Sequence, residues 1–472
     1  TMYKLFARLL HSRISTEFDT RMRSRQSGFM KGRSTADPIH IIRRLQELYE
    51  ATDSPLYMLL IDWRMAFDKL TIPGLLSALR RLGLPSHYLN LIASIYEQHH
   101  FQVRENGFCS SFFPASTGVR QGCPLSPYLF IIFMTVLMSD VDQDIKDHYT
   151  HNEHIPNTFS ALDPLYDLEY ADDLILLSRT RSFIQFLLTT IETRSAQYGM
   201  SINKSKTSLL IMNAAHSPLS TQTSPLEFSL SAPTADLTPT LLLSYLQTFG
   251  RISRTSLQLG KGRKKHSHTA TYKTSDPQLT HRILTTPHYI HETALHPQPV
   301  YNSTIYFSNG ESVPLVHSST YLGTDISDTG KQHMNLHKRS GLATQTYNKL
   351  KPFWNHADIP RSFKLRVFRA NIYPMLLYAL QHLWLTPTAQ KQIDGWQAHT
   401  LRMILGIKVS YISHITNAEV LRQAKDIPLT SYLTSSRLRY LGHVLRNTSH
   451  TSYAVVFNQR FGVPRQLAAT RR

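Results

Sequence analysis

The sequence is poor in cysteine and has no long apolar run. Cys109 and Cys123 are its only cysteines, too few for a disulfide framework or a four-cysteine zinc site. No stretch approaches the roughly 18 apolar residues of a membrane span, and the start of the chain lacks the apolar stretch of a signal peptide. These absences predict an intracellular protein without a membrane partner. The first residue is Thr1, so we expect a piece of a longer chain.

Acidic residues are scarce relative to basic ones. The 472 residues include 51 Lys+Arg and 32 Asp+Glu, a net charge of +19. A surplus of this size favours a polyanionic partner, with nucleic acid ahead of an anionic membrane; a generally basic, soluble surface is the alternative. Hydrophobic residues make up 41% of the chain and charged residues 18%, as in globular proteins.

The acids that are present include an adjacent pair, Asp172 and Asp173, within LEYADDLILLS. Apolar and acidic residues alternate over 166–170, the period of a half-buried strand, and 174–177 is an apolar run of strand length. The pattern predicts a β-hairpin with both carboxylates at its tip. Two carboxylates about 4 Å apart repel by roughly 4 kcal/mol at an effective dielectric of ~20. The pair is therefore expected to be fully solvated or to hold a cation.

A third acid, Asp62, ends the predicted strand Tyr57 to Ile61 in YMLLIDWRMAFDKL. If this strand and the hairpin are neighbours in one sheet, three carboxylates converge at one edge. Such hard oxygen ligands suit Mg²⁺. Two Mg²⁺ ions about 4 Å apart would clamp the attacking and leaving oxygens of a phosphoryl transfer.

Helical patterns alternate with these strands. One helix is predicted to start at Asp37-Pro38, with Asp37 as its N-cap, and another to run from Ser126 to about Met138. The alternation favours an α/β or α+β layer with helices behind a sheet. Residues 213–310 are rich in Ser, Thr and Pro and are predicted to be a flexible insertion. Its basic knot, Lys261 to His266, fits a nuclear-import signal, a nucleic-acid contact or a solvated loop equally well.

Six sequence blocks, in order, resemble those of a reverse transcriptase, and more narrowly of non-LTR (LINE-like) retrotransposons. They are QSGFMKGRST (26–35), IDWRMAFD (motif A), STGVRQGCPLSP (116–127, motif B), YADD (170–173, motif C), YGMSINKSKT (198–207, motif D) and STYLG (319–323, motif E). One block alone is weak, but the ordered series is specific and spans nearly the whole chain apart from the insertion. The resemblance implies an α+β right-hand polymerase fold, with a palm sheet backed by helices, partial fingers and a helical thumb.

The resemblance also implies how the chemistry is divided among residues. Asp62, Asp172 and Asp173 would hold two Mg²⁺ ions, for which Mn²⁺ could substitute, and the backbone carbonyl of Trp63 would be a further ligand. These ions would catalyse transfer of a nucleotide from a dNTP to a primer 3′-hydroxyl. Lys206 would be a general acid or charge partner for the leaving pyrophosphate, with an ordinary exposed lysine as the alternative.

Further residues are assigned to the nucleotide by the resemblance. Phe67 matches the bulky gate that collides with a 2′-hydroxyl and so selects deoxynucleotides. Asp68 is either a misaligned acid of the kind that RNA polymerases use to engage that hydroxyl, or a structural cap of the next turn. Gln121 and Gly122 match the motif B dipeptide beside the nucleotide, where glycine allows a close approach of the backbone.

Three residues are assigned to the RNA template and the DNA primer. Arg33 would contact template phosphate, with a surface ion pair as the alternative. Tyr321 and Leu322 would press on the primer end, with the core of their hairpin as the alternative. The implied division of the chain is partial fingers and fingers-palm junction at 1–55, palm at 56–212, insertion at 213–310, primer-grip hairpin at 311–328, and thumb with C-terminal region at 329–472.

Three functions remain open from the sequence. The first is RNA-directed DNA polymerase, expected to be nuclear when it acts on DNA. The second is a truncated, catalytically weak, RNA-binding protein of the maturase kind, because the upstream fingers strands that normally grip the triphosphate are absent. The third, a ribonucleotide polymerase, is disfavoured by Phe67.

Overall fold

The computed structural model describes the chain in stretches separated by gaps. The described residues are 2–52, 54–97, 100–114, 117–149, 165–213, 303–330, 333–356, 358–383, 385–447 and 451–457. All of them belong to one of two units into which the chain divides; the other unit, Gln222–Asn302, lies outside them. Most of the predicted insertion at 213–310, including its basic knot, therefore also lies outside the described residues.

A four-stranded sheet in the order β6-β7-β1-β8 forms the centre of the fold. Its strands are β1 (Leu56–Ile61), β6 (Asp167–Tyr170), β7 (Asp173–Ser178) and β8 (Ser208–Met212). Strand β1, predicted from its apolar run, pairs antiparallel with β7 and β8, and all of its residues are buried. Ile61 pairs with Leu174, which places the end of β1 beside the tip of the β6–β7 hairpin.

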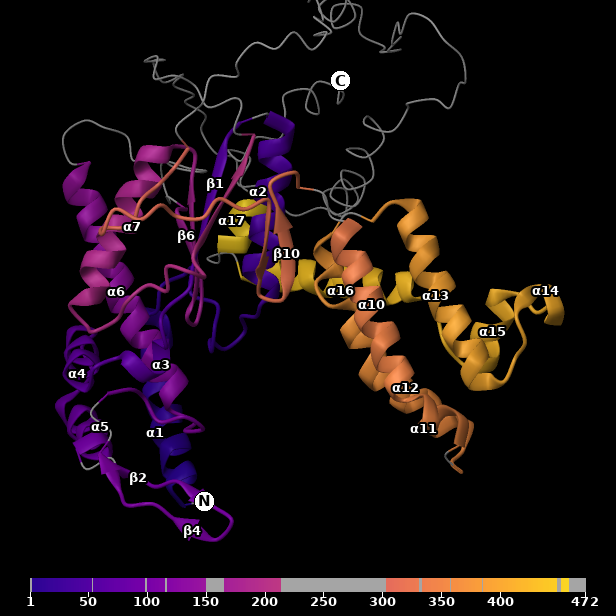
Figure 1. The fold of residues 1–472 in the computed structure, drawn as a ribbon, viewed down its shortest axis with the longest axis horizontal. Helices are drawn as coiled ribbons and strands as arrows, with labels where there is room; N and C mark the ends of the chain where they lie inside the picture. The colour runs from indigo at the N-terminus through magenta and orange to yellow at the C-terminus, as the bar shows by residue number, and fades with distance from the viewer. Residues whose placement is uncertain are drawn as a thin grey trace, which may run out of the picture. The chain divides into compact units, whose positions relative to one another are not determined.

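Alternate residues of β1 enter two different cores. Tyr57, Leu59 and Ile61 pack with the helices α6 (Ser126–His148) and α7 (Arg181–Ala196) on one face. The residues between them pack on the other face with α2 (Ala36–Thr52), α17 (Thr451–Phe457) and the β9–β10 hairpin (Ser318–Tyr321 and Thr324–Ser327). Figure 1 shows the sheet between these two layers. The predicted α+β layer with helices behind a sheet is therefore confirmed.

The segments around the sheet are mostly helical. They are α1 (Met2–Phe18), η1 (Asp19–Arg21), α3 (Ala66–Lys69), α4 (Ile72–Arg81) and α5 (Ser86–Glu97). Helix α6 continues ten residues beyond the predicted end near Met138. Val141 and Ile145, one helical turn apart, are both buried and extend the apolar face of the helix. Helix α2 begins at Ala36, so Asp37 is not its N-cap. Its carboxylate instead accepts the Ser34 N–H at 2.9 Å from within the first turn.

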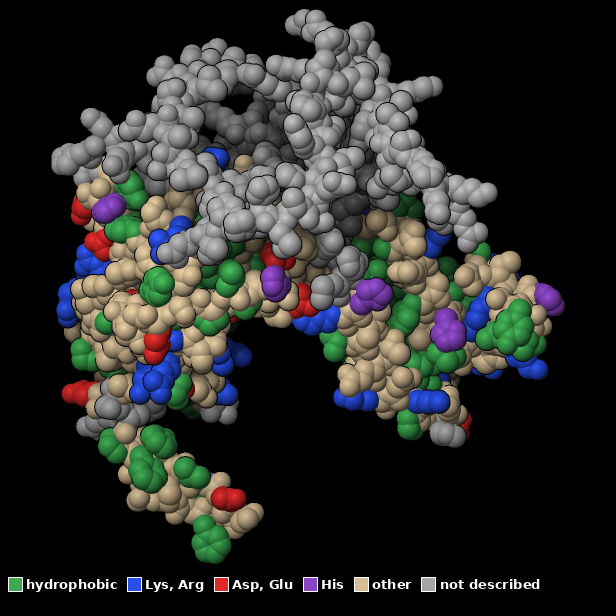
Figure 2. All heavy atoms as spheres, turned by 45° about the horizontal axis from the view of Figure 1, so that its top comes forward, with side chains coloured by type: hydrophobic (Ala, Val, Ile, Leu, Met, Phe, Trp, Pro, Cys, Tyr) green, Lys and Arg blue, Asp and Glu red, His purple; other side chains and the backbone are tan. Residues whose placement is uncertain are grey.

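Two small ribbons connect α5 to α6. They are β2 (His100–Phe101) with β5 (Phe113–Pro114), and β3 (Arg104–Glu105) with β4 (Phe108–Cys109). All of these strand residues are exposed, and their apolar side chains gather at the lower edge of Figure 2. The ribbons therefore add nothing to the cores that flank the sheet.

A separate apolar core forms after the β9–β10 hairpin. The helices of this region are α10 (His333–Lys349), α11 (Lys351–His356), α12 (Arg361–Leu377), η3 (Leu380–His382), α13 (Pro387–Leu405), α14 (Ser410–Ser413), α15 (Asn417–Ala424) and α16 (Leu429–Arg446). All of them except α14 contribute side chains to the core. Phe368, Ile372 and Leu401 are fully buried in this core. The helical pattern predicted from residue 330 onward is confirmed. No helix in the described stretches is long and apolar enough to cross a membrane.

A cluster of buried histidines lies where α2, η3 and α16 meet. The ring of His40 lies 5.5 Å from that of His382 and 5.0 Å from that of Tyr440. Neither ring nitrogen of His40 has a hydrogen-bond partner among the described residues. Burial lowers the pKa of His40 well below its usual value. Burial and the nearby charges of Arg44, Arg43 and Arg437 lower the pKa of His382 to about 3.

These histidines should make the fold sensitive to acid. Their pKa values are lower in the folded chain than the unfolded value of about 6.5, so folding favours the neutral rings, and stability should fall as the pH drops below about 6.5. At pH 5 each buried ring should cost about 2 kcal/mol. His40→Phe should raise the free energy of unfolding at pH 7 by about 1 kcal/mol, because two unpaired ring nitrogens are removed. It should also reduce the decrease in this free energy between pH 7 and 5, because phenylalanine takes up no proton. Urea unfolding at both pH values measures this. His399→Phe, at an exposed position of α13, is the control; an equal slope in all three proteins would contradict the prediction.

Candidate active site

The three predicted metal-binding acids lie at one edge of the sheet. Tyr170 pairs with Asp173, so Ala171 and Asp172 form a two-residue turn between β6 and β7. The register of β1 with β7 ends at Ile61 and Leu174, and the next positions along the two strands are Asp62 and Asp173. Residues opposite each other in an antiparallel pair point to the same face. The predicted hairpin with its carboxylates at the tip is confirmed, and Asp62 is its neighbour.

The pKa values of Asp172 and Asp173 are both raised in the fold. Loss of hydration and the charge of Asp62 raise the pKa of Asp172. Loss of hydration, followed by the charges of Asp172 and Asp62, raises the pKa of Asp173 to about 6. Mutual repulsion of this kind is the electrostatic condition that a divalent cation relieves, and carboxylate oxygens are the donors that Mg²⁺ prefers.

The acids do not by themselves form a ready metal cage. Among the described residues, no group of three or more His, Cys, Asp or Glu side chains is arranged to hold a metal ion. Like-charged carboxylates repel, so a chain without a cation has no force drawing three of them to one point. The donor set and its electrostatics fit a divalent ion, and its ligand geometry would form around the ion.

The motif A and motif B segments are joined by backbone contacts. Val119 N–H donates to Phe67 O at 2.8 Å, and Gly118 N–H donates to Leu70 O at 2.8 Å. A Cβ atom at Gly118, where φ is +85°, would lie 2.9 Å from the Cα of Asp68. Only glycine therefore lets the two segments approach this closely. The carboxylate of Asp68 accepts a hydrogen bond from Gln121 Nε2 at 3.1 Å, a contact that the sequence does not reveal.

A hollow of about 170 Å³ lies between these segments. Its lining residues are Phe67, Val119, Arg120, Gln121, Gly122, Cys123, Ser126 and Pro127. Three of the predicted nucleotide residues, Phe67, Gln121 and Gly122, are thus brought together. The ring of Phe67 packs against Phe130 of α6 with centroids 4.4 Å apart, which fixes its position from behind.

The motif D segment is attached to the end of β1. Asn203 N–H donates to Asp62 O at 2.7 Å, and Asp62 N–H donates to Thr207 Oγ1 at 3.2 Å. Trp63 is buried, and its backbone forms a bridge with Ile202. Lys206 is exposed on the same segment, three residues after Asn203.

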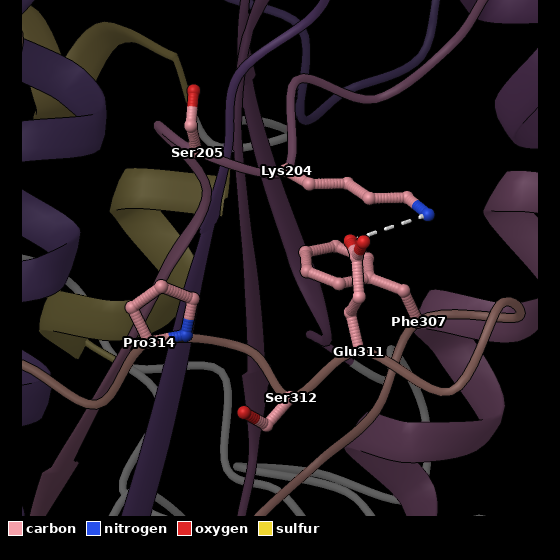
Figure 3. Close-up of a pocket in the computed structure, with 6 residues that line it drawn as sticks. All are labelled: Lys204, Ser205, Phe307, Glu311, Ser312 and Pro314. Carbon is pink, nitrogen blue, oxygen red and sulfur yellow. Dashed lines mark ion pairs between the residues drawn. The ribbon is translucent and has the colours of Figure 1, made fainter.

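A larger hollow of about 560 Å³ lies on the other side of this segment. Figure 3 shows its lining residues, Lys204, Ser205, Phe307, Glu311, Ser312 and Pro314. Lys204 Nζ lies 3.6 Å from a Glu311 carboxylate oxygen and 5.4 Å from the centroid of the Phe307 ring. None of the predicted site residues lines this hollow. Its contacts bind the chain after residue 303 to the segment that carries Lys206.

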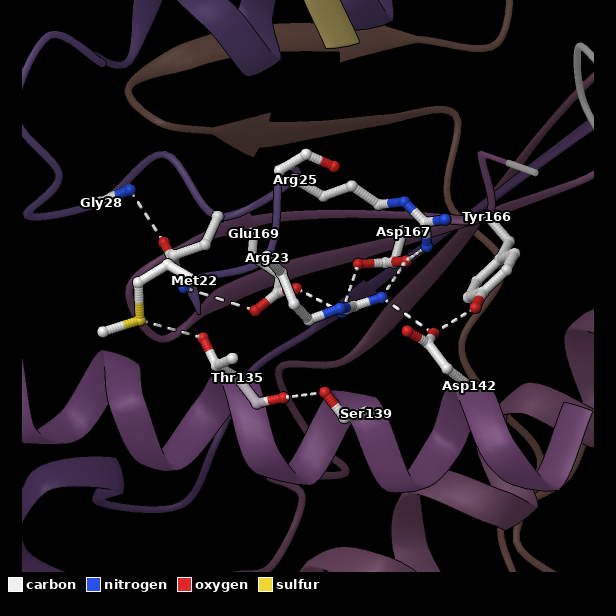
Figure 4. Close-up of polar contacts among 12 residues, drawn as sticks. Met22, Arg23, Arg25, Gly28, Thr135, Ser139, Asp142, Tyr166, Asp167 and Glu169 are labelled. Carbon is white, nitrogen blue, oxygen red and sulfur yellow. Dashed lines mark hydrogen bonds and ion pairs between the residues drawn. The ribbon is translucent and has the colours of Figure 1, made fainter. Parts of the chain in front are cut away.

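A buried charge network supports the β6–β7 hairpin from behind, and the sequence analysis missed it. Alternation over 166–170 predicted a half-buried strand, but Asp167 and Glu169 are both fully buried. Figure 4 shows Arg23 and Arg25 reaching these acids from the segment after η1. Arg23 donates to both oxygens of Asp167, at 3.0 and 3.1 Å, and also to Glu169. Arg25 donates to Asp167 as well.

The two buried acids of the network have opposite pKa shifts. Burial raises the pKa of Asp167, but the guanidinium groups of Arg23 and Arg25 outweigh this and hold it below its usual value. Burial and the charge of Asp167 raise the pKa of Glu169 to about 8 against the opposing charge of Arg23. Arg23 also binds Asp142 of α6 at 2.9 Å. With Glu169 protonated, two guanidinium charges match the two remaining carboxylates.

The residues predicted to contact nucleic acid lie in different environments. Arg33 Nη1 donates to the backbone carbonyls of Arg23 at 2.9 Å and Ser24 at 3.1 Å, and also to Gln26 O. Its contact with a template stays a prediction. Tyr321 is buried in the core behind the sheet, the alternative given for it, and Leu322 is half-buried at the tip of the β9–β10 hairpin.

Comparison with known proteins identifies the family of this chain. The sequence pattern of the reverse transcriptase (RNA-dependent DNA polymerase) family matches residues 1–240. This chain belongs to the reverse transcriptase family. The predicted resemblance to non-LTR retrotransposon enzymes is confirmed by its curated relatives. Enzymes of this family generally depend on divalent metal ions, and they bind RNA templates.

Several curated proteins similar to this chain come from transposable elements. The chain is 28% identical over 219 residues to the probable RNA-directed DNA polymerase from transposon BS of Drosophila melanogaster, covering 44% of this chain and 22% of that protein. It is 29% identical over 185 residues to the RNA-directed DNA polymerase from mobile element jockey of the same fly, covering 38% and 18%. The aligned part of this reverse transcriptase thus spans about a fifth of these relatives.

Among solved structures, matches at lower sequence identity include telomerases. A telomerase from Candida albicans, in complex with a fragment of telomeric RNA, is 13% identical, with a TM-score of 0.39. The match covers 89% of this chain and 56% of that one. The architecture of this reverse transcriptase is given by its own four-stranded sheet and by the family match.

Replacing Asp173 should stabilise the metal-free protein. The pKa of this acid is about 6 in the fold, above the unfolded value of about 3.9, so its charge costs stability above pH 6 and the cost vanishes as the pH falls towards 4. Asp173→Asn should therefore raise the free energy of unfolding at pH 8 by up to roughly 1 kcal/mol, allowing for solvent screening, and should have no effect near pH 4. Urea unfolding in the presence of a chelator measures both. Asp147→Asn, at an exposed position of α6, is the control; a pH-independent effect of Asp173→Asn would contradict the prediction.

Proposed function

We propose that the chain is the polymerase core of a non-LTR retrotransposon reverse transcriptase. It extends a DNA primer with deoxynucleotides along an RNA template. The observation that carries this proposal is the register that brings Asp62 beside the Asp172–Asp173 tip of the hairpin. The hollow lined by Phe67 and Gly122 also supports it, because a nucleotide needs a site and Phe67 follows Asp62 by five residues.

The proposed reaction joins the primer to the α-phosphorus of a dNTP. A bond forms between the primer 3′-oxygen and that phosphorus, the bond to pyrophosphate breaks, and the hydroxyl proton is released. Two Mg²⁺ ions, or Mn²⁺ in their place, would be held by Asp62, Asp172, Asp173 and the carbonyl of Trp63, and would supply positive charge to the attacking and leaving oxygens. Lys206 would neutralise or protonate the pyrophosphate; its place on a segment bonded to Asp62 supports that role.

The nucleotide is proposed to lie in the hollow between motifs A and B. Phe67 would exclude a 2′-hydroxyl, and Gln121 and Gly122 would lie against the base and sugar. The hydrogen bond from Gln121 to Asp68 supports this arrangement, since it holds the amide at the mouth of the hollow.

The partners of this core are proposed to be an RNA template and a DNA primer. The net charge of +19 supports a polyanionic partner. Arg33 is proposed for the template, and Tyr321 and Leu322 for the primer, with Leu322 better supported because it is not fully buried. Acting on DNA, such an enzyme would work in the nucleus.

The proposal is tested by primer extension. The chain should extend a DNA primer on an RNA template in Mg²⁺, and Asp172→Asn should lower the rate by at least roughly a thousandfold, because one of the metal-binding carboxylates loses its charge. Asp147→Asn should leave the rate unchanged. Salt-sensitive RNA binding by the wild type without any extension would favour the maturase-like alternative instead.

Sugar selection tests the hollow itself. Phe67→Val should reduce the preference for dNTPs over rNTPs at least roughly tenfold, because the ring that collides with a 2′-hydroxyl is gone. Single-nucleotide incorporation of dATP and ATP measures the ratio of the two kcat/KM values. Phe133→Leu, which alters the ring next to Phe130 away from the hollow, is the control. An unchanged ratio in Phe67→Val would remove Phe67 from the proposed role.

A further inference from the structure

Gln26 makes an unusual set of contacts for a residue that no part of the reaction uses. Its side chain is fully buried. Its amide oxygen accepts two backbone N–H groups, from Ala171 at 2.9 Å and from Gly28 at 2.8 Å. Its amide nitrogen donates to Glu169 Oε2 at 3.3 Å. One side chain thus connects the turn that carries Asp172 with the buried charge network behind it.

The turn that Gln26 holds has a strained residue. Ala171, the first residue of the two-residue turn, has φ +57°. Hairpin turns with only this first central position at positive φ favour glycine there, because a Cβ atom is crowded in that conformation. An alanine keeps such a conformation only when its surroundings enforce it. The hydrogen bond from Ala171 N–H to Gln26 Oε1 is such a constraint.

The same turn is fixed sterically by Gly28. A Cβ atom at Gly28 would lie 2.3 Å from Ala171 N and 2.9 Å from Tyr170 C. The backbone after Gln26 therefore lies directly against the motif C turn. Hydrogen bonds from Ser27 N–H to Glu169 O, at 2.8 Å, and from Glu169 N–H to Arg25 O, at 3.2 Å, extend this contact along β6.

The orientation of the Gln26 amide is set by Glu169, which lies on the opposite side of the amide from the Ala171 turn. Glu169 accepts from both Gln26 and Arg23, so the amide nitrogen faces the acid and the amide oxygen faces the turn. Reversing the amide would place its NH₂ group against two N–H donors. The network of Arg23 and Glu169 therefore selects the one orientation in which Gln26 can accept from Ala171.

We propose that Gln26 is a positioning residue of the active site. Its amide oxygen holds the Ala171–Asp172 turn in its strained conformation, and thereby sets where the carboxylates of Asp172 and Asp173 can meet a divalent ion. This inference rests on the proposed function for its kinetic consequences. Its structural part, that the amide holds the turn, is independent of any activity.

Gln26→Met tests the inference, since methionine has a similar length and lacks the acceptor. The kcat for primer extension should fall at least roughly tenfold, and the Mg²⁺ concentration for half-maximal activity should rise at least roughly threefold. The KM for dNTP should change by less than about threefold, because the motif A and B hollow is untouched. In hydrogen exchange, the amide of Ala171 should lose at least roughly tenfold of its protection.

Gln397→Met is the matched control. Gln397 of α13 is also fully buried, accepts from Leu429 N–H at 3.0 Å and donates to Ile427 O at 2.9 Å, but it touches no part of the sheet. It should destabilise the chain to a similar degree while leaving the Mg²⁺ requirement and the exchange of Ala171 unchanged. Equal Mg²⁺ requirements in the two variants would overturn the proposal.

Gly28→Ala provides a second route to the same result. It keeps Gln26 but pushes a Cβ atom against Ala171, so it should raise the Mg²⁺ requirement and deprotect the Ala171 amide as Gln26→Met does. Normal values in both variants would reject the inference. A wild type that shows no extension, but whose Ala171 amide is protected and becomes deprotected in Gln26→Met, would instead overturn the proposed function and leave the positioning role standing.

Discussion

The structure around the site depends on how five acids are accommodated at the β6–β7 hairpin and the adjoining end of β1. Asp167 and Glu169 are buried behind the hairpin, where Arg23 and Arg25 meet them and the raised pKa of Glu169 leaves one carboxyl neutral. Asp62, Asp172 and Asp173 at the tip have no such partner in the described residues, and loss of hydration and neighbouring carboxylates raise the pKa values of Asp172 and Asp173. Buried carboxylates need a cationic side chain held beside them by the fold, whereas carboxylates at the edge of the sheet can be neutralised by a metal ion from solution. This division explains how one hairpin holds a structural pair of acids on β6 and, at its tip, two of the three acids proposed to bind metal.

The local pattern of the sequence predicted the elements but not their long-range partners. An apolar run gave β1, and alternation with an acidic pair gave the β6–β7 hairpin, because each signal lies within a few consecutive residues. The same alternation was wrong about the polar face of β6, since the arginines that bury it lie more than 140 residues earlier in the chain. Helix α6 was predicted too short for a related reason. Beyond Met138 only every fourth residue is apolar, so the sequence pattern is weak there. The helix is stabilised by tertiary packing of those apolar residues.

The site residues divide in the same way. The motifs predicted that Asp62 meets Asp172 and Asp173, and the sheet register brings them to one edge. They also assigned Phe67, Gln121 and Gly122 to one nucleotide site, and these three line one hollow. The motifs could not foresee that Asp68 binds Gln121, or that the guanidinium of Arg33 faces backbone carbonyls. The Asp68–Gln121 contact is set by how two loops from different parts of the chain meet, and Gly118 permits that meeting by having no side chain. The Arg33 contacts depend instead on how residues 23–33 fold back on themselves.

The β9–β10 hairpin shows that the helical region after residue 330 is also coupled to the sheet. Its two turn residues, Leu322 and Gly323, both have positive φ. A leucine is strained in that conformation, so other contacts must stabilise the turn. Tyr378, from the end of α12, donates to Leu322 O at 2.8 Å, and the guanidinium of Arg339 lies 4.4 Å above the Tyr378 ring while donating to Gly323 O. The turn is thus held by two residues of the helical region, just as the motif C turn is held by Gln26. Both hairpin tips owe their conformation to side chains far away in the sequence. A movement of α12 would therefore displace the hydrogen bond from Tyr378 to Leu322, and a movement of α10 would displace the one from Arg339 to Gly323. Either movement would change the turn without passing through the sheet.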